Sequence, residues 1–446
     1  MALTLPGCST VSGWFGGDRP AEGAPGFVRG FIGAVVADEP QAVLAGRKVL
    51  AGGGNAADAA VAMGMALAVT LPSRAGLGSG GACLALNGDS KASGVPDAFV
   101  FTPTATAGTA GADRPAAAPM LARGLFLMHA RHGKTRFEAL ILPAEQMARE
   151  GVAVSRAFTR DLAVVGPALA SDQAARLAFF PGGRAPAEGE MLLQPDLGGT
   201  LAQLRRAGVG DLYVGALAQR LVAAATGSGL TMADLRAALP RVAPPMLVAI
   251  SSEAEAVFLP LPADGGLAAA ASFQALRANP ADLAGAQAAG LAAAAQARGI
   301  GSLPSLPAST TFAAIDPAGN AVVCAVSMGN LFGTGRVAPG TGMLLAASPA
   351  WMPPPLYAAG MITYRRTSSA RVVVGGSGQE GAALAVAKAM ADSLTDQGSA
   401  ARINPAAVPD PGRANIIACN APPSRSPESC GWSTDPRGFG LATGSN

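Results

Sequence analysis

Three consecutive hydroxyl residues, Ser309, Thr310 and Thr311, begin an apolar run that is typical of a strand and could supply a nucleophile. A hydroxyl group attacks a carbonyl only when a nearby base accepts its proton. The chain has two histidines, His129 and His132, so a three-histidine zinc site is excluded and a Ser-His-Asp triad would have to use one of them. We interpret His132 as a solvated residue at a helix end. By themselves, the hydroxyl residues also fit an ordinary strand start.

The elements that must position these hydroxyls are indicated by apolar periodicity. Residues 40–50 and 56–71 predict two helices separated by a glycine stop, and the second is apolar on nearly every side, which predicts complete burial. After position 308 the pattern predicts a hairpin over residues 312–328, a strand over 371–378 and a helix over 381–396. Strands and helices in this arrangement indicate a layered α+β fold.

Composition excludes several classes of protein. The chain has 446 residues, half of them apolar and 14% charged, which is enough for a large core and excludes an extended disordered chain. Its formal charge is +3, with no cluster of lysine and arginine between aromatic residues, so we expect no nucleic-acid partner. No motif calls for a metal or an organic cofactor, and we expect neither.

Three blocks of sequence are more specific than any single residue. They read GGGNAADAAVAMGMALAVTLPSRAGLGSGG at 52–81, ASTTFAAIDPAGNAV at 308–322 and NLFGTGRVAPGTGMLL at 330–345, with a weaker STDPRGFGLA near the C-terminus. In order and spacing they resemble the gamma-glutamyltransferase family, also called gamma-glutamyltranspeptidase or glutathione hydrolase. The resemblance implies an N-terminal-nucleophile (Ntn) hydrolase, a four-layer αββα sandwich whose precursor cuts itself into a large and a small part.

The resemblance also implies where the chain is cut. Ungapped counting back from Asp316 puts the family's nucleophilic threonine on Ser309, and a shift of one residue would put it on Thr310; we prefer Ser309. The freed α-amino group would then serve as the base, which removes the need for histidine. The chain would divide into a tail and linker over residues 1–25, a large part over 26–308 and a small part over 309–446, the last two forming one αββα domain.

Further site residues follow from the same resemblance. Ser327 matches a threonine that supports the nucleophile by hydrogen bonding, and Asn330 lies beside the position of a family asparagine, which is Gly329 here. Gln379 and Glu380 stand at the glycine pair whose backbone N–H groups form the oxyanion hole.

The family's substrate clamps are altered. Phe99 replaces the arginine that grips a carboxylate, and Ala350 and Trp351 replace the acidic residues that grip an amino group. Our candidate substrate-binding residues are Phe99, Arg366 and Thr367; Arg365 and Glu380 are further candidates to compensate for the lost charges.

The N-terminal sequence MALTLPGCSTVSG resembles the end of a bacterial lipoprotein signal, with Cys8 as the lipid-bearing residue. This favours the cell envelope or periplasm, and the other interpretation is a frayed cytoplasmic terminus with a chance cysteine. Cys419 and Cys430 could form a disulfide in an oxidising compartment, whereas the apolar runs around Cys83 and Cys324 predict buried thiols. No apolar run reaches the length of a bilayer span.

The sequence is therefore compatible with two functions. One is a self-processing amidase that transfers or hydrolyses a gamma-glutamyl or related acyl group of a small amide or peptide, with its two fragments remaining associated. The other is an inactive relative that acts as an envelope binding or structural protein, an alternative motivated by Phe99, Trp351 and Gly329.

Overall fold

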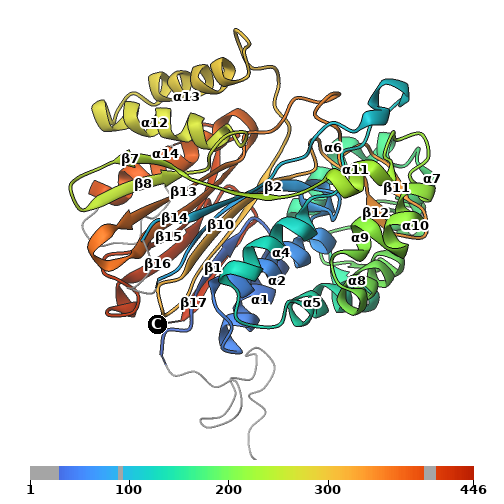
Figure 1. Cartoon of the computed structure of the whole chain (residues 1–446), viewed down its shortest axis with the longest axis horizontal. Coiled ribbons are helices and arrows are strands. Elements are labelled where there is room, and N and C mark those ends of the chain that lie inside the picture. Colours follow the sequence, from blue (N-terminus) through green and yellow to red (C-terminus); the bar gives the residue numbers. More distant parts are fainter. Residues whose placement is uncertain (1–29, 89–93, 396–407, 446) are drawn as a thin grey trace, which may run out of the picture.

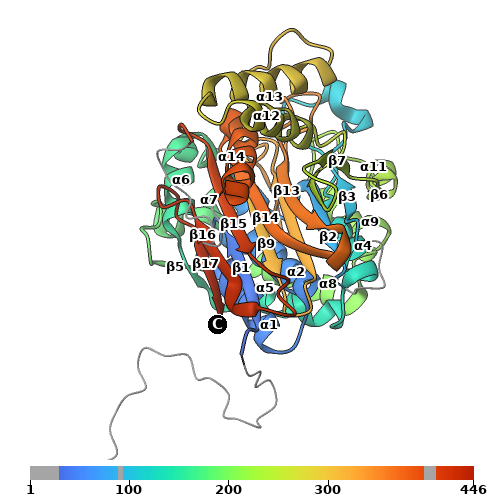
Figure 2. The ribbon, with the colours of Figure 1, turned by 90° about the vertical axis from the view of Figure 1, so that its left-hand side faces the viewer.

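Two antiparallel sheets stack face to face at the centre of the molecule, and helices cover the outer face of each (Figures 1 and 2). The computed structural model describes residues 30–88, 94–395 and 408–445. The layer order is helix, sheet, sheet, helix, as predicted for an α+β fold of the αββα type. The predicted tail over residues 1–25, including Cys8, lies outside the described residues.

The first sheet has seven strands in the order β17-β1-β9-β10-β2-β3-β6. Their bounds are β1 Gly33–Ala37, β2 Gly80–Leu86, β3 Asp97–Phe101, β6 Arg241–Ala243, β9 Thr310–Ile315, β10 Ala321–Ser327 and β17 Leu441–Ser445. The second sheet has six strands in the order β16-β15-β14-β13-β8-β7. Their bounds are β7 Met246–Ala249, β8 Ala254–Phe258, β13 Ala358–Tyr364, β14 Ser369–Ser377, β15 Arg413–Cys419 and β16 Cys430–Thr434. Both sheets combine strands from before and after Ser309, so the two halves of the chain share one core.

The outer layers differ in size (Figure 1). The first sheet is covered by α1 (Pro40–Ala51), α2 (Ala56–Thr70) and α4 (Leu121–His132), with α5 (Phe137–Glu150) packed on α2. The second sheet is covered by α12 (Gly265–Ala278) and α14 (Ala382–Thr395), and α13 (Leu283–Ala297) packs on α12. The remaining helices are α3 Pro72–Ala75, α6 Arg156–Leu169, α7 Gln173–Phe179, α8 Pro195–Ala207, α9 Asp211–Val214, α10 Ala216–Ala224 and α11 Met232–Ala237. Two small ribbons pair β4 (Val152–Ala153) with β5 (Met191–Leu192) and β11 (Val337–Ala338) with β12 (Met343–Leu344).

Helix α2 confirms the prediction of complete burial, since each of its residues is buried. The Asn55 side chain accepts a hydrogen bond from the Asp58 backbone N–H, and the Asp58 carboxylate accepts one from the Asn55 backbone N–H, so a capping box starts the helix. At Gly64 a Cβ atom would lie 2.7 Å from Leu125 and 3.2 Å from Phe312 of β9. Glycine therefore lets α2 approach the strand that follows Ser309.

Side chains of β9 alternate between two cores. Phe312 and Ala314 pack against the helices of the first layer, and Ala313 and Ile315 pack between the sheets. Strand geometry gives this period of two, so the residues before Thr310 continue it. Successive side chains of β9 therefore point alternately into the helix layer and into the space between the two sheets.

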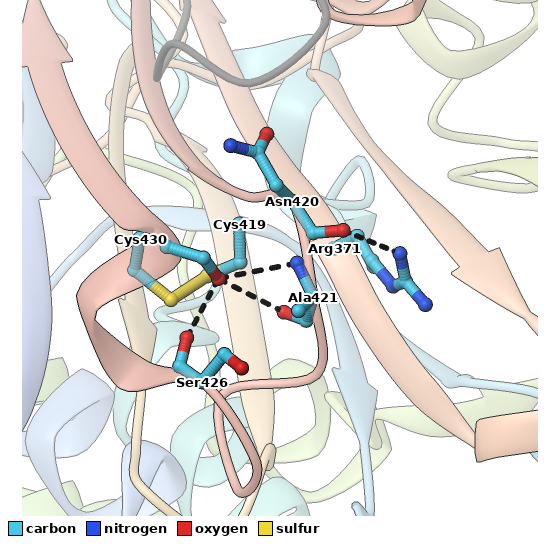
Figure 3. Close-up of a disulfide and its surroundings, with 7 residues drawn as sticks. Arg371, Cys419, Asn420, Ala421, Ser426 and Cys430 are labelled. Carbon is cyan, nitrogen blue, oxygen red and sulfur yellow. Dashed lines mark hydrogen bonds between the residues drawn. A yellow bond between two sulfur atoms is a disulfide. The ribbon is translucent and has the colours of Figure 1, made fainter.

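Two disulfides are present. Cys419 and Cys430 are paired across the β15–β16 ladder, which confirms their predicted pairing, and nearby Arg371 donates a 2.6 Å hydrogen bond to the Asn420 carbonyl oxygen (Figure 3). Cys83 and Cys324 also form a disulfide, so the prediction of two thiols is wrong. They stand directly opposite each other on β2 and β10, with Cα atoms 4.1 Å apart, a cross-strand pairing that apolar neighbours alone do not reveal.

Among the described residues no helix is long and apolar enough to cross a bilayer. Within the same ranges, no group of three or more histidine, cysteine or acidic side chains is arranged to hold a metal ion.

Candidate active site

Ser309 lies immediately before β9, at the end of the proline-containing segment of residues 301–308. The strand alternation places it on the side that faces the second sheet. The residue is 1% exposed, and its hydroxyl is buried with no hydrogen-bond partner among the described residues. Buried hydroxyls are usually paired, so this atom stands out as one available for chemistry.

Thr310 has a different environment. Its Oγ1 donates a 2.8 Å hydrogen bond to Asp38 Oδ2, from the corner between β1 and α1, and the same carboxylate oxygen accepts from the Thr311 N–H at 3.2 Å. The hydroxyl of Thr310 is therefore engaged in holding the start of β9. Of the two candidate nucleophiles, only Ser309 has an unengaged hydroxyl.

Ser327 ends β10 beside Ser309. The ladder pairs Val326 with Thr310, so the next residues in register are Ser327 and Ser309. The Ser327 hydroxyl donates a 2.6 Å hydrogen bond to the carbonyl oxygen of Ala308 and accepts one at 3.0 Å from the Gly329 N–H. The carbonyl of the peptide bond before Ser309 is thus oriented and polarised by a neighbouring hydroxyl.

Gln379 and Glu380 form the turn between β14 and α14, where Gly378 and Gln379 both have positive φ, 99° and 54°. The Gln379 side chain donates a 2.8 Å hydrogen bond to the Leu306 carbonyl oxygen. This turn therefore contacts the segment before Ser309 through a side chain, and the role of its backbone N–H groups as oxyanion donors stays a prediction. Glu380 is half-buried and makes no ion pair with a described residue.

Asn330 lies in the turn after β10, close in sequence to Ser327. Its carbonyl oxygen accepts from the Gly333 N–H at 3.0 Å, and its side chain makes no hydrogen bond with the described part of the chain. Gly329 before it has a φ of 72° and lies against the Ala347 carbonyl, where a Cβ would be 2.8 Å away. A side chain at Gly329 itself would be strained.

The three candidate substrate-binding residues are not brought to Ser309. Phe99 of β3 is fully buried on the helix-facing side of the first sheet, with its ring edge-on to His132. Arg366 and Thr367 belong to the turn η3 (Arg365–Thr367) before β14, whereas Gln379 follows the end of that strand. Nine strand residues, roughly 30 Å at the usual rise, separate the two ends.

The histidines also lie elsewhere. His129 Nε2 is 3.1 Å from Asp58 and His132 Nε2 is 2.9 Å from Asp97, both at the end of α4. The Asn55 side chain donates to the His132 carbonyl oxygen, and the Ala56 N–H donates to Asp316, which follows the far end of β9 from Ser309. His132 does end its helix, but the prediction that it is solvated is wrong, because its side chain is 11% exposed and packs against Phe99 and Asp97. Both imidazoles are bound to carboxylates at the far end of β9 from Ser309.

Two residues of the site, Asp38 and Asn415, were missed from the sequence. The Asn415 side chain of β15 donates to Asp38 Oδ1 at 2.8 Å and to Thr311 Oγ1 at 3.0 Å, and so ties the two sheets together beneath Ser309. A weak signal existed for Asp38, which precedes Glu39 and Pro40 at a predicted helix start. Nothing local marks Asn415.

A cavity of about 380 Å³ opens near this end of the first sheet. It is lined by four chain segments: residues 39–41, 153–156, 188–189 and 438–440. Ser309 does not line it. The segment before Ser309 is held by hydrogen bonds from Gln379 to the Leu306 carbonyl oxygen and from Ser327 to the Ala308 carbonyl oxygen.

Comparisons with known proteins agree with this architecture. Residues 42–298 match the family model of gamma-glutamyltranspeptidase. Among solved structures, cephalosporin acylase from Bacillus halodurans is similar in fold, with a TM-score of 0.75, 18% identity, and coverage of 93% of this chain and 96% of that one.

Curated relatives match over part of their length. The capsule biosynthesis protein CapD proenzyme of Bacillus anthracis is 30% identical over 188 residues, which cover 42% of this chain and 34% of that protein. The glutathione hydrolase proenzyme of Bacillus subtilis is 31% identical over 209 residues, covering 42% and 35%. The matches thus span about a third of these relatives. More than half of this chain matches the family model, and the chain belongs to the gamma-glutamyltranspeptidase family.

Proposed function

We propose that this protein is a self-processing amidase that uses Ser309, first on its own chain and then on an external amide. The observation that carries the proposal is the arrangement around the Ala308–Ser309 bond. A buried, unpartnered hydroxyl follows a carbonyl that already accepts a hydrogen bond from Ser327.

The first reaction is an N-to-O acyl shift. Ser309 Oγ attacks the carbonyl carbon of Ala308, the C–N bond breaks, and the hydroxyl proton passes to the departing nitrogen. Water then hydrolyses the resulting ester, which leaves a carboxylate on Ala308 and an α-amino group on Ser309. Ser327 supports this step because its hydrogen bond strengthens as negative charge develops on the Ala308 oxygen.

The second reaction uses the new terminus. An α-amino group has a pKa of about 8, so near neutral pH a useful fraction accepts the proton of its own hydroxyl, directly or through a water molecule. Ser309 then attacks the substrate amide, an acyl-enzyme forms, and water or an amine resolves it. Backbone N–H groups of the Gln379–Glu380 turn are the candidate oxyanion donors.

The acyl group is gamma-glutamyl or a related one, in keeping with the family and with relatives named glutathione hydrolase. Opening of the segment 301–308 after the cut gives substrate access to Ser309. Two disulfides support an oxidising compartment, so we place the protein in the cell envelope, with Cys8 as its lipid anchor.

The test is the mass of the purified protein after disulfide reduction, followed over time. Cleavage before Ser309 gives a small fragment of 138 residues that begins with Ser309. The Ser309→Ala variant stays full-length, whereas the matched Thr310→Val variant is still cut. A wild-type chain that stays intact and turns over no amide would favour the inactive relative, and a fragment beginning with Thr310 would move the nucleophile by one residue.

A further inference from the structure

Tyr357 is a second residue between the sheets with an unpaired polar group. It directly precedes β13, next to the Ala358–Gly376 pair of the β13–β14 ladder, and packs in the core between the sheets. The residue is 2% exposed, and its hydroxyl has no hydrogen-bond partner among the described residues. A buried phenol normally has one.

An ion pair lies beside Tyr357. Arg298 Nε and Nη2 donate to the two oxygens of Asp264 at 2.5 and 3.0 Å. Asp264 directly precedes Gly265, where a Cβ atom would lie 2.5 Å from the backbone of Tyr357. Burial raises the pKa of Tyr357, and the nearby Asp264 carboxylate raises it further while Arg298 lowers it. The remaining guanidinium nitrogen, Arg298 Nη1, is buried and has no partner in the described structure.

These donors belong to the same end of the sandwich as Ser309. Arg298 directly precedes the segment that leads to Ser309. That segment is held by Gln379, which lies two residues beyond Ser377, the end of the strand paired with β13. Strand β13 also packs against β10, the strand that carries Ser327. Ser309, Tyr357 and Arg298 thus each have a buried polar atom with no partner among the described residues, Ser309 before β9, Tyr357 before β13 and Arg298 beside Asp264 at the start of α12.

We propose that Tyr357 and Arg298 bind an uncharged oxygen acceptor, such as a carboxamide, of the acyl group that Ser309 takes, so that this group is a relative of gamma-glutamyl without its carboxylate; this inference rests on the proposed function. The phenol O–H and the Nη1–H supply two donors. Asp264 already balances the guanidinium charge, and a substrate carboxylate would lie close to the Asp264 carboxylate. A neutral acceptor satisfies both donors without that repulsion.

Access to these donors follows from the cut. Once the Ala308–Ser309 bond breaks, residues 299–308 become the free end of the large fragment, which is held by side-chain hydrogen bonds from Gln379 to Leu306 and from Ser327 to Ala308 and by the buried Leu306 side chain. The displacement that exposes Ser309 also exposes the chain next to Arg298. The same event therefore prepares the nucleophile and its acyl-binding site.

The experiment uses the cleaved protein and three 4-nitroanilides of equal acyl length, ending in a carboxamide (glutaramic acid), a carboxylate (glutaric acid) or a methyl group (pentanoic acid). The carboxamide is expected to have the highest kcat/KM. Tyr357→Phe should lower it about tenfold for the carboxamide and less than twofold for the methyl-terminated anilide, since one hydrogen bond is lost.

Arg298→Lys keeps a cation for Asp264 but removes Nη1, and should show the same selectivity. The matched control is Tyr364→Phe, at the other end of β13, which should leave all three values unchanged. Equal losses on all three anilides, or a preference for the carboxylate, would overturn the inference while cleavage and turnover keep the proposed function intact. Absence of cleavage and of any turnover would overturn both.

Discussion

The two ends of β9 differ in the hydrogen bonding of one buried polar group each. At one end, Asp316 in the β9–β10 turn accepts hydrogen bonds from the N–H groups of Ala56, Ala318 and Asn320 and from the Asn320 side chain, at 2.7 to 3.1 Å. At the other end of β9, Ser309 is as deeply buried and its hydroxyl has no partner.

This difference indicates that Asp316 has a structural role and that the Ser309 hydroxyl is available for a reaction. Buried polar groups that are fully paired stabilise a unique conformation, whereas unpaired ones cost free energy and persist where they serve another purpose. The end that contains Asp316 therefore fixes the register of β9 and β10. At the end that contains Ser309, the neighbouring polar groups are paired and the Ser309 hydroxyl is in place without a partner among the described residues.

The largest expected effect tests the role of Ser327. Ser327→Ala removes the hydrogen bond to the Ala308 carbonyl oxygen and should slow self-cleavage by about 100-fold, as for other donors to a developing oxyanion. The measurement is the rate at which the small fragment appears under reducing conditions. Ser327→Thr, which keeps the hydroxyl, should restore most of the rate. A Ser327→Ala chain that cuts at the wild-type rate would contradict this role.

Asp316→Ala should lower the stability of the protein and leave its cleavage rate largely unchanged. It leaves several buried donors unpaired and should lower the free energy of unfolding by about 3 kcal/mol, without a direct effect on the reacting groups. Urea unfolding in a Ser309→Ala background, which keeps the chain uncut, measures this change. Asp316→Asn is the milder control. If Asp316→Ala slowed cleavage as much as Ser327→Ala, the two ends would not differ as described.

Asn415→Ala should have an intermediate effect at the end near Ser309. It removes the hydrogen bonds to Asp38 and Thr311, while Asp38 still accepts from the Thr310 hydroxyl and the Thr311 N–H, so we expect a loss of about 1 kcal/mol in unfolding free energy. The start of β9 should also become less well positioned, which is measured as a few-fold slower cleavage. Unchanged stability and cleavage together would show that this bridge between the sheets is dispensable.

The smallest expected effect concerns pH. Burial raises the pKa of Asp58, but hydrogen bonds from His129 and from the backbone of Asn55 and Lys134 outweigh it and lower the pKa overall. The native state thus binds fewer protons than the unfolded state near this pKa. Stability from Asp58 is present above the unfolded pKa of about 4 and is lost as the pH falls through the lower native value.

Asp58→Asn should therefore flatten the decline in unfolding free energy below about pH 4, and unfolding curves measured across this range detect the change. The pKa of Asp316 is shifted in the opposite direction to that of Asp58, because burial raises it despite the hydrogen bonds to the carboxylate. Its contribution decreases as the pH rises through the raised value. If the unfolding free energy fell equally steeply with decreasing pH in the wild type and in Asp58→Asn, the lowered pKa of Asp58 would be contradicted.

Elements with local signals were predictable from the sequence. The burial of α2, the turn at Asp316 and the helix after residue 381 depend on short patterns, and each is present. Ser309, Ser327 and Gln379 were predicted as site residues from the family resemblance, and the structure places Ser327 and Gln379 against the segment before Ser309.

Other features depend on register and on distant contacts. Phe99 and Ser309 both belong to the first sheet, but the period of two puts Phe99 on the helix side, which spacing in the sequence does not specify. Asp38 meets Thr310 from 272 residues away, and Asn415 meets Asp38 from 377 residues away. Arg366 and Thr367 are close in sequence to Gln379, yet a full strand length separates them.

The Cys83–Cys324 disulfide has a consequence for any cut at Ser309. Cys83 lies in the large part and Cys324 in the small part, on adjacent strands of the first sheet. Cleavage would convert one chain into two polypeptides that remain covalently tethered through a buried crosslink. Without a reductant such a cleaved protein would migrate on a denaturing gel as a single species, and its two polypeptides could not separate on dilution.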